Sequence, residues 1–278
     1  MKKIVIALGG NALQDGNKDA TAEAQLEIVR ETVKHLADII EDGNMVTITH
    51  GNGPQVGRIV IQNELASEVT PAMPFDVCGA MSQGMIGYHM QQALGDEMRK
   101  RGIKKPVATV VTQVVVDKED SGRGYRRVVA SPQPKRIVEI ETVKTLIEKD
   151  NVVIAVGGGG IPVIEEEGML KGVAAVIDKD LASQRLAEDI DADILIVLTA
   201  VEKVAINFGK PNQKNLDRVS TEEMKKYAEE GHFAPGSMLP KVLAAIRFVE
   251  SRPGRKAIIT SLEKAKDAIK GLSGTIIE

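Results

Sequence analysis

Three short runs of apolar and β-branched residues, each ending in a glycine-rich turn, constrain the fold of this chain most. They cover residues 4–8, 46–49 and 152–156 and lead into Gly9-Gly10-Asn11, His50-Gly51-Asn52-Gly53 and Gly157-Gly158-Gly159-Gly160. Such runs are typical of buried parallel strands. Glycine after a strand lets the backbone turn sharply and present its N–H groups, and converging N–H groups bind anions. Three such turns, with lysines downstream, predict a phosphate-handling enzyme.

Strand and helix patterns alternate along the chain, which predicts a mostly parallel α/β sheet with helices on both faces. Right-handed crossovers would then bring the glycine turns to one edge. We expect a hairpin over 112–130 with a polar tip at 117–124. The expected helices cover 22–41, 55–65, 82–101, 139–149, 178–189, 221–230, 238–251 and 262–270, and the later strands cover 107–111, 194–198, 202–206, 256–260 and 274–277.

Composition excludes several function classes. The 278 residues are 43% hydrophobic and 27% charged, and the net charge is −3 with the basic residues dispersed, so no nucleic-acid partner is expected. No stretch approaches the roughly 20 apolar residues that cross a bilayer, so no membrane partner is expected either. Four His and one Cys offer no zinc-type ligand set, so no metal-ligating residue is expected. A single cysteine also fits a reducing, cytoplasmic location.

The glycine turns lack both common phosphate fingerprints, because none continues into Gly-Lys-Ser/Thr and none has the Rossmann spacing. Lysines from elsewhere must therefore neutralise the phosphates. Lys179 lies at a predicted helix start, where Asp178 or Asp180 could orient it. Lys241 follows a rigid turn that opens another helix, and the Asn11 amide can donate to an anion.

Two further residues invite a chemical role, but a structural interpretation is preferred for both. His50 ends a predicted buried strand and has no carboxylate partner in the motif, so we interpret it as a structural histidine rather than a base. Cys78 lies in an apolar run and is interpreted as a small buried hydrophobe rather than a nucleophile.

Long segments of the chain resemble carbamate kinases, a family within the amino-acid kinase superfamily, in the family's order. These segments are residues 7–12, 50–57, 80–88, 122–129, 157–162, 175–180, 207–213 and 232–241. The resemblance implies an open three-layer αβα sandwich, treated as one kinase-like domain with a carbamate lobe over 1–172 and a nucleotide lobe over 173–278. It also implies reversible phosphoryl transfer between ATP and carbamate, Mg²⁺ bound mainly through the nucleotide phosphates, and a homodimer.

The same resemblance implies the roles of individual residues. Lys179 and Lys241 would hold the transferring phosphoryl group and the nucleotide phosphates, and Asp180 would organise both lysines. Backbone amides of Gly9, Gly10 and Asn11 would meet phosphate, whereas Gly51, Asn52 and Gly53 would border carbamate. The adenine and ribose would be enclosed by residues 199–213 and 234–241, among them Thr199, Ala200, Val201, Lys210, Pro235, Gly236, Ser237 and Met238.

One departure from the family is a missing lid. Carbamate kinases usually insert a subdomain of some tens of residues after the strand that matches 114–117, whereas here Asp117 leads through 118–121 directly into Gly122. The lid's lysine has no match, since Lys118 is too close to the strand end to be taken as its equivalent. Natural loss, engineered removal and omission of the segment remain alternatives. Two other functions stay open as well: a nucleotide-binding homologue without catalysis, and another acyl-phosphate-forming kinase.

Overall fold

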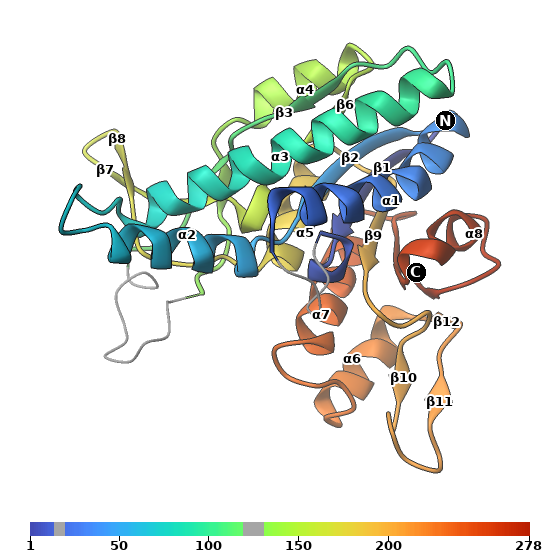
Figure 1. The fold of residues 1–278 in the computed structure, drawn as a ribbon. Helices are drawn as coiled ribbons and strands as arrows, with labels where there is room; N and C mark the ends of the chain where they lie inside the picture. Colours follow the sequence, from blue (N-terminus) through green and yellow to red (C-terminus); the bar gives the residue numbers. More distant parts are fainter. Residues whose placement is uncertain (14–19, 119–130) are drawn as a thin grey trace.

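A mostly parallel sheet of eight strands forms the centre of the part of the chain that the computed structural model describes, residues 1–13, 20–118 and 131–278 (Figure 1). Its strand order is β12-β14-β13-β9-β1-β2-β6-β3, and β13 and β14 run antiparallel. The strands are β1 (Lys3–Leu8), β2 (Met45–His50), β3 (Val107–Thr109), β6 (Val152–Ile154), β9 (Ile194–Leu198), β12 (Arg218–Val219), β13 (Lys256–Thr260) and β14 (Thr275–Ile277). The expected α/β sheet is therefore confirmed.

The side chains of the central strand β1 point alternately to the two faces of the sheet and pack in two separate hydrophobic cores. Ile4, Ile6 and Leu8 pack with α1 (Ala22–Glu41), α3 (Phe75–Lys100) and α8 (Ala265–Ile269) on one face. Val5 points to the other face and packs with the second group of helices. That group consists of α4 (Ile140–Glu148), α5 (Lys179–Asp189), α6 (Thr221–Glu229) and α7 (Met238–Glu250). Helix, sheet and helix form three layers, because successive side chains of a strand point to opposite faces.

Two smaller β elements lie beside the main sheet. A four-stranded sheet has the order β5-β4-β7-β8, and a separate hairpin joins β10 to β11. Their bounds are β4 (Gln113–Val115), β5 (Arg136–Ile137), β7 (Ile161–Glu166), β8 (Met169–Gly172), β10 (Ala205–Ile206) and β11 (Lys214–Asn215). The turn between β7 and β8 has positive φ at Glu167 and Gly168, as a two-residue type I′ hairpin requires.

The structure corrects one helix boundary. Residues 82–101 were expected as a helix that enters at Ser82, but α3 begins at Phe75 after Pro74, about two turns earlier. Gly79 and the nearby glycines lower the helix propensity of this segment, so the sequence pattern does not reveal its first turns. The packing of the buried face of α3 against α1 compensates for this low propensity. Cys78 is 1% exposed within this helix, which confirms its interpretation as a buried hydrophobe.

Other boundaries differ by smaller amounts. The strand expected over 107–111 ends at Thr109. The second strand of the hairpin expected over 112–130 falls largely within 119–130, outside the described residues, and β4 pairs antiparallel with β5 in the part that is described. The last helix pattern, 262–270, is divided into a 3-10 helix, η3 (Leu262–Lys264), and α8.

The parallel register brings the predicted turns to one edge of the sheet. Leu8 pairs with His50 and Ala7 with Val197, so the turns after β1, β2 and β9 begin side by side. Strands from before residue 173 occupy one half of the sheet and strands from after it occupy the other. No helix in the described ranges is long and apolar enough to span a membrane. In open α/β sheets, ligands bind at the carboxyl ends of the strands, so the functional residues are expected along this edge.

Candidate active site

Two lysines and one aspartate meet at the carboxyl edge of the sheet. Lys179 is the first residue of α5, and its Nζ donates to Asp180 Oδ1 at 2.5 Å. Lys241 lies in the first turn of α7, and its Nζ donates to Asp180 Oδ2 at 2.8 Å. Asp178 has a different role: its side chain accepts a hydrogen bond from the backbone N–H of Asp180 at 2.8 Å and caps α5. Asp180 is therefore the residue that joins the two lysines.

The cluster is buried and carries an excess of positive charge. The Asp180 side chain is 3% exposed, and those of Lys179 and Lys241 are 16% and 15% exposed. Burial by itself would raise the pKa of Asp180, but the two ammonium groups lower it below its ordinary value. Burial lowers the pKa of Lys179, and repulsion by Lys241 adds to that effect against the attraction of Asp180. One carboxylate between two ammonium groups leaves a site that favours an anion.

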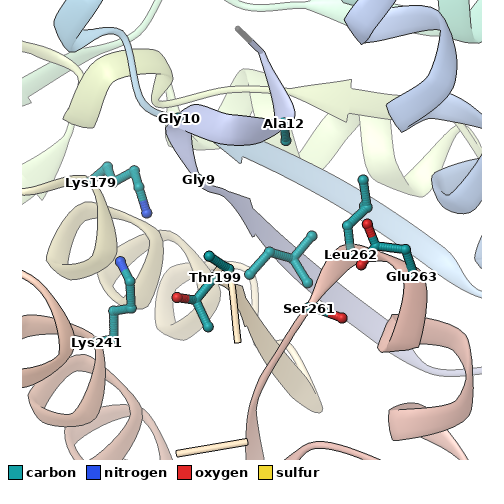
Figure 2. A pocket seen from close by; sticks show the side chains of 11 residues that line it. Gly9, Gly10, Ala12, Lys179, Thr199, Lys241, Ser261, Leu262 and Glu263 are labelled. Carbon is teal, nitrogen blue, oxygen red and sulfur yellow. The ribbon is translucent and has the colours of Figure 1, made fainter. Parts of the chain in front are cut away.

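A cavity of about 450 Å³ lies beside this cluster. Figure 2 shows the Lys179 and Lys241 side chains projecting into it next to Gly9. Gly9 is closely packed, since a Cβ there would lie 3.1 Å from the carbonyl oxygen of Leu198. The residues that line this cavity are Gly9, Gly10, Ala12, Lys179, Leu198, Thr199, Ala200, Lys241, Ser261, Leu262 and Glu263.

A second cavity of about 470 Å³ adjoins the first, since Thr199 and Lys241 line both. It lies between the β10–β11 hairpin and the loop that precedes α7, and its lining is more apolar. Phe208 is 66% exposed on the hairpin, whereas Phe233 is 3% exposed. The remaining lining residues are Val201, Lys203, Ala205, Asn207, Lys210, Gly231, His232, Ala234, Ser237 and Met238. An apolar slot that opens toward paired lysines suits a planar base with a charged tail.

The turn after β2 contacts Lys179 and the turn after β6. A Cβ on Gly51 would lie 3.2 Å from Lys179 Cδ, so the lysine stem rests on that turn. Asn52 donates from Nδ2 to Ser82 Oγ at 2.7 Å and occupies the space where a Gly158 Cβ would be, at 2.2 Å from Nδ2. The second and third glycine turns are therefore in direct contact next to the lysine cluster.

The structure brings most of the predicted site residues together. Gly9, Gly10, Thr199 and Ala200 line the first cavity with both lysines, and Val201, Lys210, Ser237 and Met238 line the second. Pro235 and Gly236 are exposed beside that cavity without lining it. Gly53 begins α2 (Gly53–Leu65) and is exposed, and the side chain of Asn11 lies outside the described residues.

Sequence reasoning missed two parts of this region. Residues 261–263 line the first cavity, and the signal for them was their place directly after the strand that ends at Thr260. Gln83 donates to the Gly157 carbonyl, which no local pattern indicates because Gln83 lies in the middle of a helix. His50 packs against the same turn and is 1% exposed, which agrees with its interpretation as a structural histidine.

Comparison with known proteins agrees with this geometry. Residues 2–261 match the profile of the amino acid kinase family. The chain is 52% identical to carbamate kinase of Clostridium perfringens and 51% identical to that of Thermococcus kodakarensis, with 99% of this chain and at least 98% of each relative covered. It is 53% identical to the carbamate kinase-like protein YqeA of Escherichia coli, with 99% of both chains covered.

Solved structures give the same result. Carbamate kinase from Giardia lamblia bound to AMP-PNP superposes with a TM-score of 0.95 at 40% identity and covers 99% of this chain and 98% of that one. UMP kinase from Bacillus anthracis, at 15% identity and a TM-score of 0.61, shares the fold alone.

The fold and the paired lysines define a phosphotransferase built on an αβα sandwich. The chain belongs to the amino acid kinase family and, within it, to the carbamate kinases. The alignment with the Clostridium perfringens relative spans 311 positions, more than the 278 residues present here, so that relative has residues without a counterpart in this chain.

Proposed function

We propose that this chain transfers a phosphoryl group reversibly between ATP and carbamate, with Lys179, Asp180 and Lys241 as its catalytic centre. The observation that carries the proposal is the buried contact of both lysines with one carboxylate where the two cavities meet. The acceptor is inferred from relatives named carbamate kinase over nearly their whole length. In the cell, we expect the chain to make ATP in the cytoplasm from carbamoyl phosphate produced by arginine or related catabolism.

The nucleotide occupies both cavities in this proposal. Its base lies in the apolar slot near Phe208 and Phe233, and its phosphates extend past Thr199 toward Lys241. A relative's structure that contains AMP-PNP supports a nucleotide site in this fold. The amides of Gly9 and Gly10 lie along the first cavity, where they can donate to phosphate oxygens.

The acceptor enters from the side of Gly51 and Asn52, so the phosphoryl group moves between the two substrates past Lys179. Phosphoryl transfer has a loose transition state, and the protein mainly positions the reactants and stabilises charge. The Lys179 and Lys241 ammonium groups stabilise charge on the transferred oxygens, and Asp180 keeps them apart at fixed positions. Carbamate attacks through an oxygen that is already anionic, so the reaction needs no strong base.

Mg²⁺ fits this site as an ion bound mainly by nucleotide phosphates. Among the described residues, no three His, Cys, Asp or Glu side chains are grouped so as to hold a metal ion. Asp180 already accepts from both lysines, so it is not a free ligand. Mg²⁺ commonly binds phosphates with few protein carboxylates, and when bound it neutralises phosphate charge.

The missing lid should affect the acceptor more than the nucleotide. The additional residues of the relatives are attributed to the lid inserted after Asp117, and Lys118 is exposed near that point. Because the lid would cover carbamate and supply a further lysine, its loss predicts weaker carbamate retention and slower turnover while nucleotide binding is kept. Equal acceptor affinity and turnover in a lid-bearing relative would contradict this expectation.

The decisive experiment measures ATP formation from MgADP and carbamoyl phosphate. Lys179→Ala should lower kcat by about a thousandfold, because it removes a cation from the transition state. Lys105→Ala is a matched control, since Lys105 is also ion-paired, at 2.6 Å from Asp150, and its side chain is 18% exposed away from the site. It should retain wild-type activity.

Two other outcomes would replace the proposal. MgADP binding without transfer in either direction would make the chain a nucleotide-binding homologue that has lost catalysis. Transfer to acetylglutamate or aspartate instead of carbamate would make it a different acyl-phosphate-forming kinase.

The assembly proposed for this chain is a homodimer through α2 and α3. Large apolar side chains are exposed on these helices and on the segment between them, as expected of a protein interface. They are Ile61, Leu65, Val69, Met73, Val77, Met81 and Tyr88, from 36% to 91% exposed. Sedimentation should give twice the 29.9 kDa chain mass for the wild type and a monomer for the Leu65→Lys, Met81→Lys variant. A monomeric wild type would contradict the dimer.

A further inference from the structure

His50 lies between two of the glycine turns that border the acceptor side of the site. It is the last residue of β2 and is 1% exposed. Its Nδ1 is 2.9 Å from the carbonyl oxygen of Gly51. Because a carbonyl can only accept, Nδ1 carries a hydrogen. Burial lowers the pKa of His50 to about 4, so near pH 7 the ring is neutral, Nε2 keeps its lone pair, and Nδ1 donates to the first peptide of the turn at Gly51.

The other edge of the ring meets the third glycine turn. A Cβ on Gly157 would lie 2.5 Å from His50 Nε2 and 2.6 Å from Cε1, so the ring fills the space where any other residue would place its side chain. Contacts this close are possible only for glycine. The ring thus sets how near the turn at Gly157 can approach the turn at Gly51.

Gln83 holds the same turn by hydrogen bonds. Its Nε2 donates to the Gly157 carbonyl at 2.8 Å and to the Thr112 carbonyl at 3.2 Å, and its Oε1 accepts the Thr112 N–H at 2.9 Å. Gly157 is consequently held from α3 by Gln83 and from β2 by His50. Gln83 holds the Gly157 peptide by a hydrogen bond, whereas His50 restricts it by packing against the glycine.

The two turns in contact with His50 also carry the reacting region. The stem of Lys179 rests on Gly51, and the side chain of Asn52 fills the space beside Gly158. A shift of the His50 ring would move Gly51 and Gly157 relative to Lys179. Rate and affinity are sensitive to displacements of about 1 Å at a reacting centre.

We propose that His50 is a positioning residue for the phosphoryl acceptor, which sets the spacing of the Gly51–Gly53 and Gly157–Gly160 turns without touching the substrate. This inference rests on the proposed function and deepens it. It differs from a catalytic-base role, because the ring donates to its own turn and its other edge meets Gly157. It also differs from simple core packing, because it predicts an effect on one substrate only.

The test compares the KM for carbamoyl phosphate with the KM for MgADP in three variants. His50→Leu removes the donor to Gly51 and should raise the carbamoyl phosphate KM about tenfold, the effect of one lost hydrogen bond, with the MgADP KM within about twofold. His50→Asn keeps a donor near the Nδ1 position and should recover most of this loss. His89→Asn is the control, since His89 is a buried histidine of α3, 8% exposed, with no bond to either turn.

Each result supports or overturns the proposal. Equal changes in both KM values, or a lower melting temperature with unchanged KM values, would reduce His50 to a structural residue. If His50→Leu does not fold, His50→Gln serves in its place, because its amide reaches past the Nδ1 position and also loses the bond to Gly51. A wild type that forms no ATP from carbamoyl phosphate would defeat the proposed function itself, whereas an active wild type with unaffected variants would defeat this inference alone.

Discussion

The glycines on the proposed acceptor side and those on the proposed nucleotide side look alike in sequence but are held by different forces. In the turn after β6, neighbouring atoms occupy the place of every missing side chain: those of His50, Asn52, Ile177 and Val114 lie 2.2 to 2.5 Å from Cβ positions built on Gly157–Gly160. On the nucleotide side, nothing lies within 4 Å of such a position at Gly209, Gly231 or Gly236, although all three have positive φ.

This difference separates a turn fixed by packing from turns fixed only by backbone conformation. The turn at 157–160 cannot change its path without displacing β2, α3 and β4, so this proposed acceptor side is held in one arrangement by packing. The nucleotide-side turns keep open space around them and can adjust. Substitutions should therefore cost far more in the first region than in the second.

Gly159→Ala should produce the largest effect. Its Cβ would lie 2.2 Å from the carbonyl oxygen of Ile177 at a φ of +90°, which combines backbone strain with overpacking and should destabilise the fold by about 4 kcal/mol. Gly43→Ala isolates the strain, because Gly43 has a φ of +84° with nothing within 4 Å, and should cost about 1 kcal/mol. Urea unfolding measures both. Equal losses would show that packing adds nothing to the backbone strain at Gly159.

The pH dependence of stability should reveal the buried histidine next to that turn. Burial lowers the pKa of His50 from 6.5 to about 4, against the opposing effect of the Gly51 carbonyl. Below pH 6.5 the unfolded chain binds a proton that the folded chain does not, so stability is complete above pH 6.5 and falls toward pH 4.

His50 should account for about 3 kcal/mol of that fall, so the stability of His50→Asn should decline less with acid by this amount. Denaturant titrations at several pH values give the difference, and parallel curves for the two proteins would refute the assignment. His89→Asn provides the comparison with a second buried histidine. Burial lowers the pKa of His89 as well, but His89 lies on α3 and not at the end of β2.

The nucleotide side should give the smallest effects. Gly209→Ala, at a φ of +75° in open space, should cost about 1 kcal/mol of stability and leave the carbamoyl phosphate KM unchanged. Lys210→Ala should raise the MgADP KM about threefold, as expected for one exposed cation that lines the cavity proposed for the base of an anionic nucleotide. Steady-state kinetics with each substrate varied in turn would detect the change. A larger effect on carbamoyl phosphate than on MgADP would reverse the comparison.

Much of the fold and the core of the site could be predicted because their signals are local. The runs that became β1, β2, β6 and β9 are short, apolar and bounded by glycine or polar residues, so their type is visible without tertiary context. Lys179 and Lys241 stood out because each opens a helix after a turn. The β7–β8 hairpin was missed although Glu167-Gly168 carried a turn signal, and α3 was shortened because its first turns are stabilised by packing.

The choice between Asp178 and Asp180 marks the limit of reasoning from local residues. Both lie beside Lys179 in the sequence, and the motif alone allows either to orient it. The helix start decides, because Asp178 is committed as the N-cap of α5 and Asp180 projects toward Lys241, which is 61 residues away in the chain. No local pattern contains that second lysine.

By itself, the sequence determined the α/β class, and it predicted the sheet edge and the two lysines that are proposed for phosphate chemistry, because strand length, glycine placement and helix starts depend on neighbouring residues. Only the tertiary structure shows the contact of one buried carboxylate with both lysines, which the family resemblance implied, and the packing of His50 and the hydrogen bond of Gln83 at Gly157. Those contacts join elements far apart in the chain, and their geometry arises only when the helices pack on the sheet.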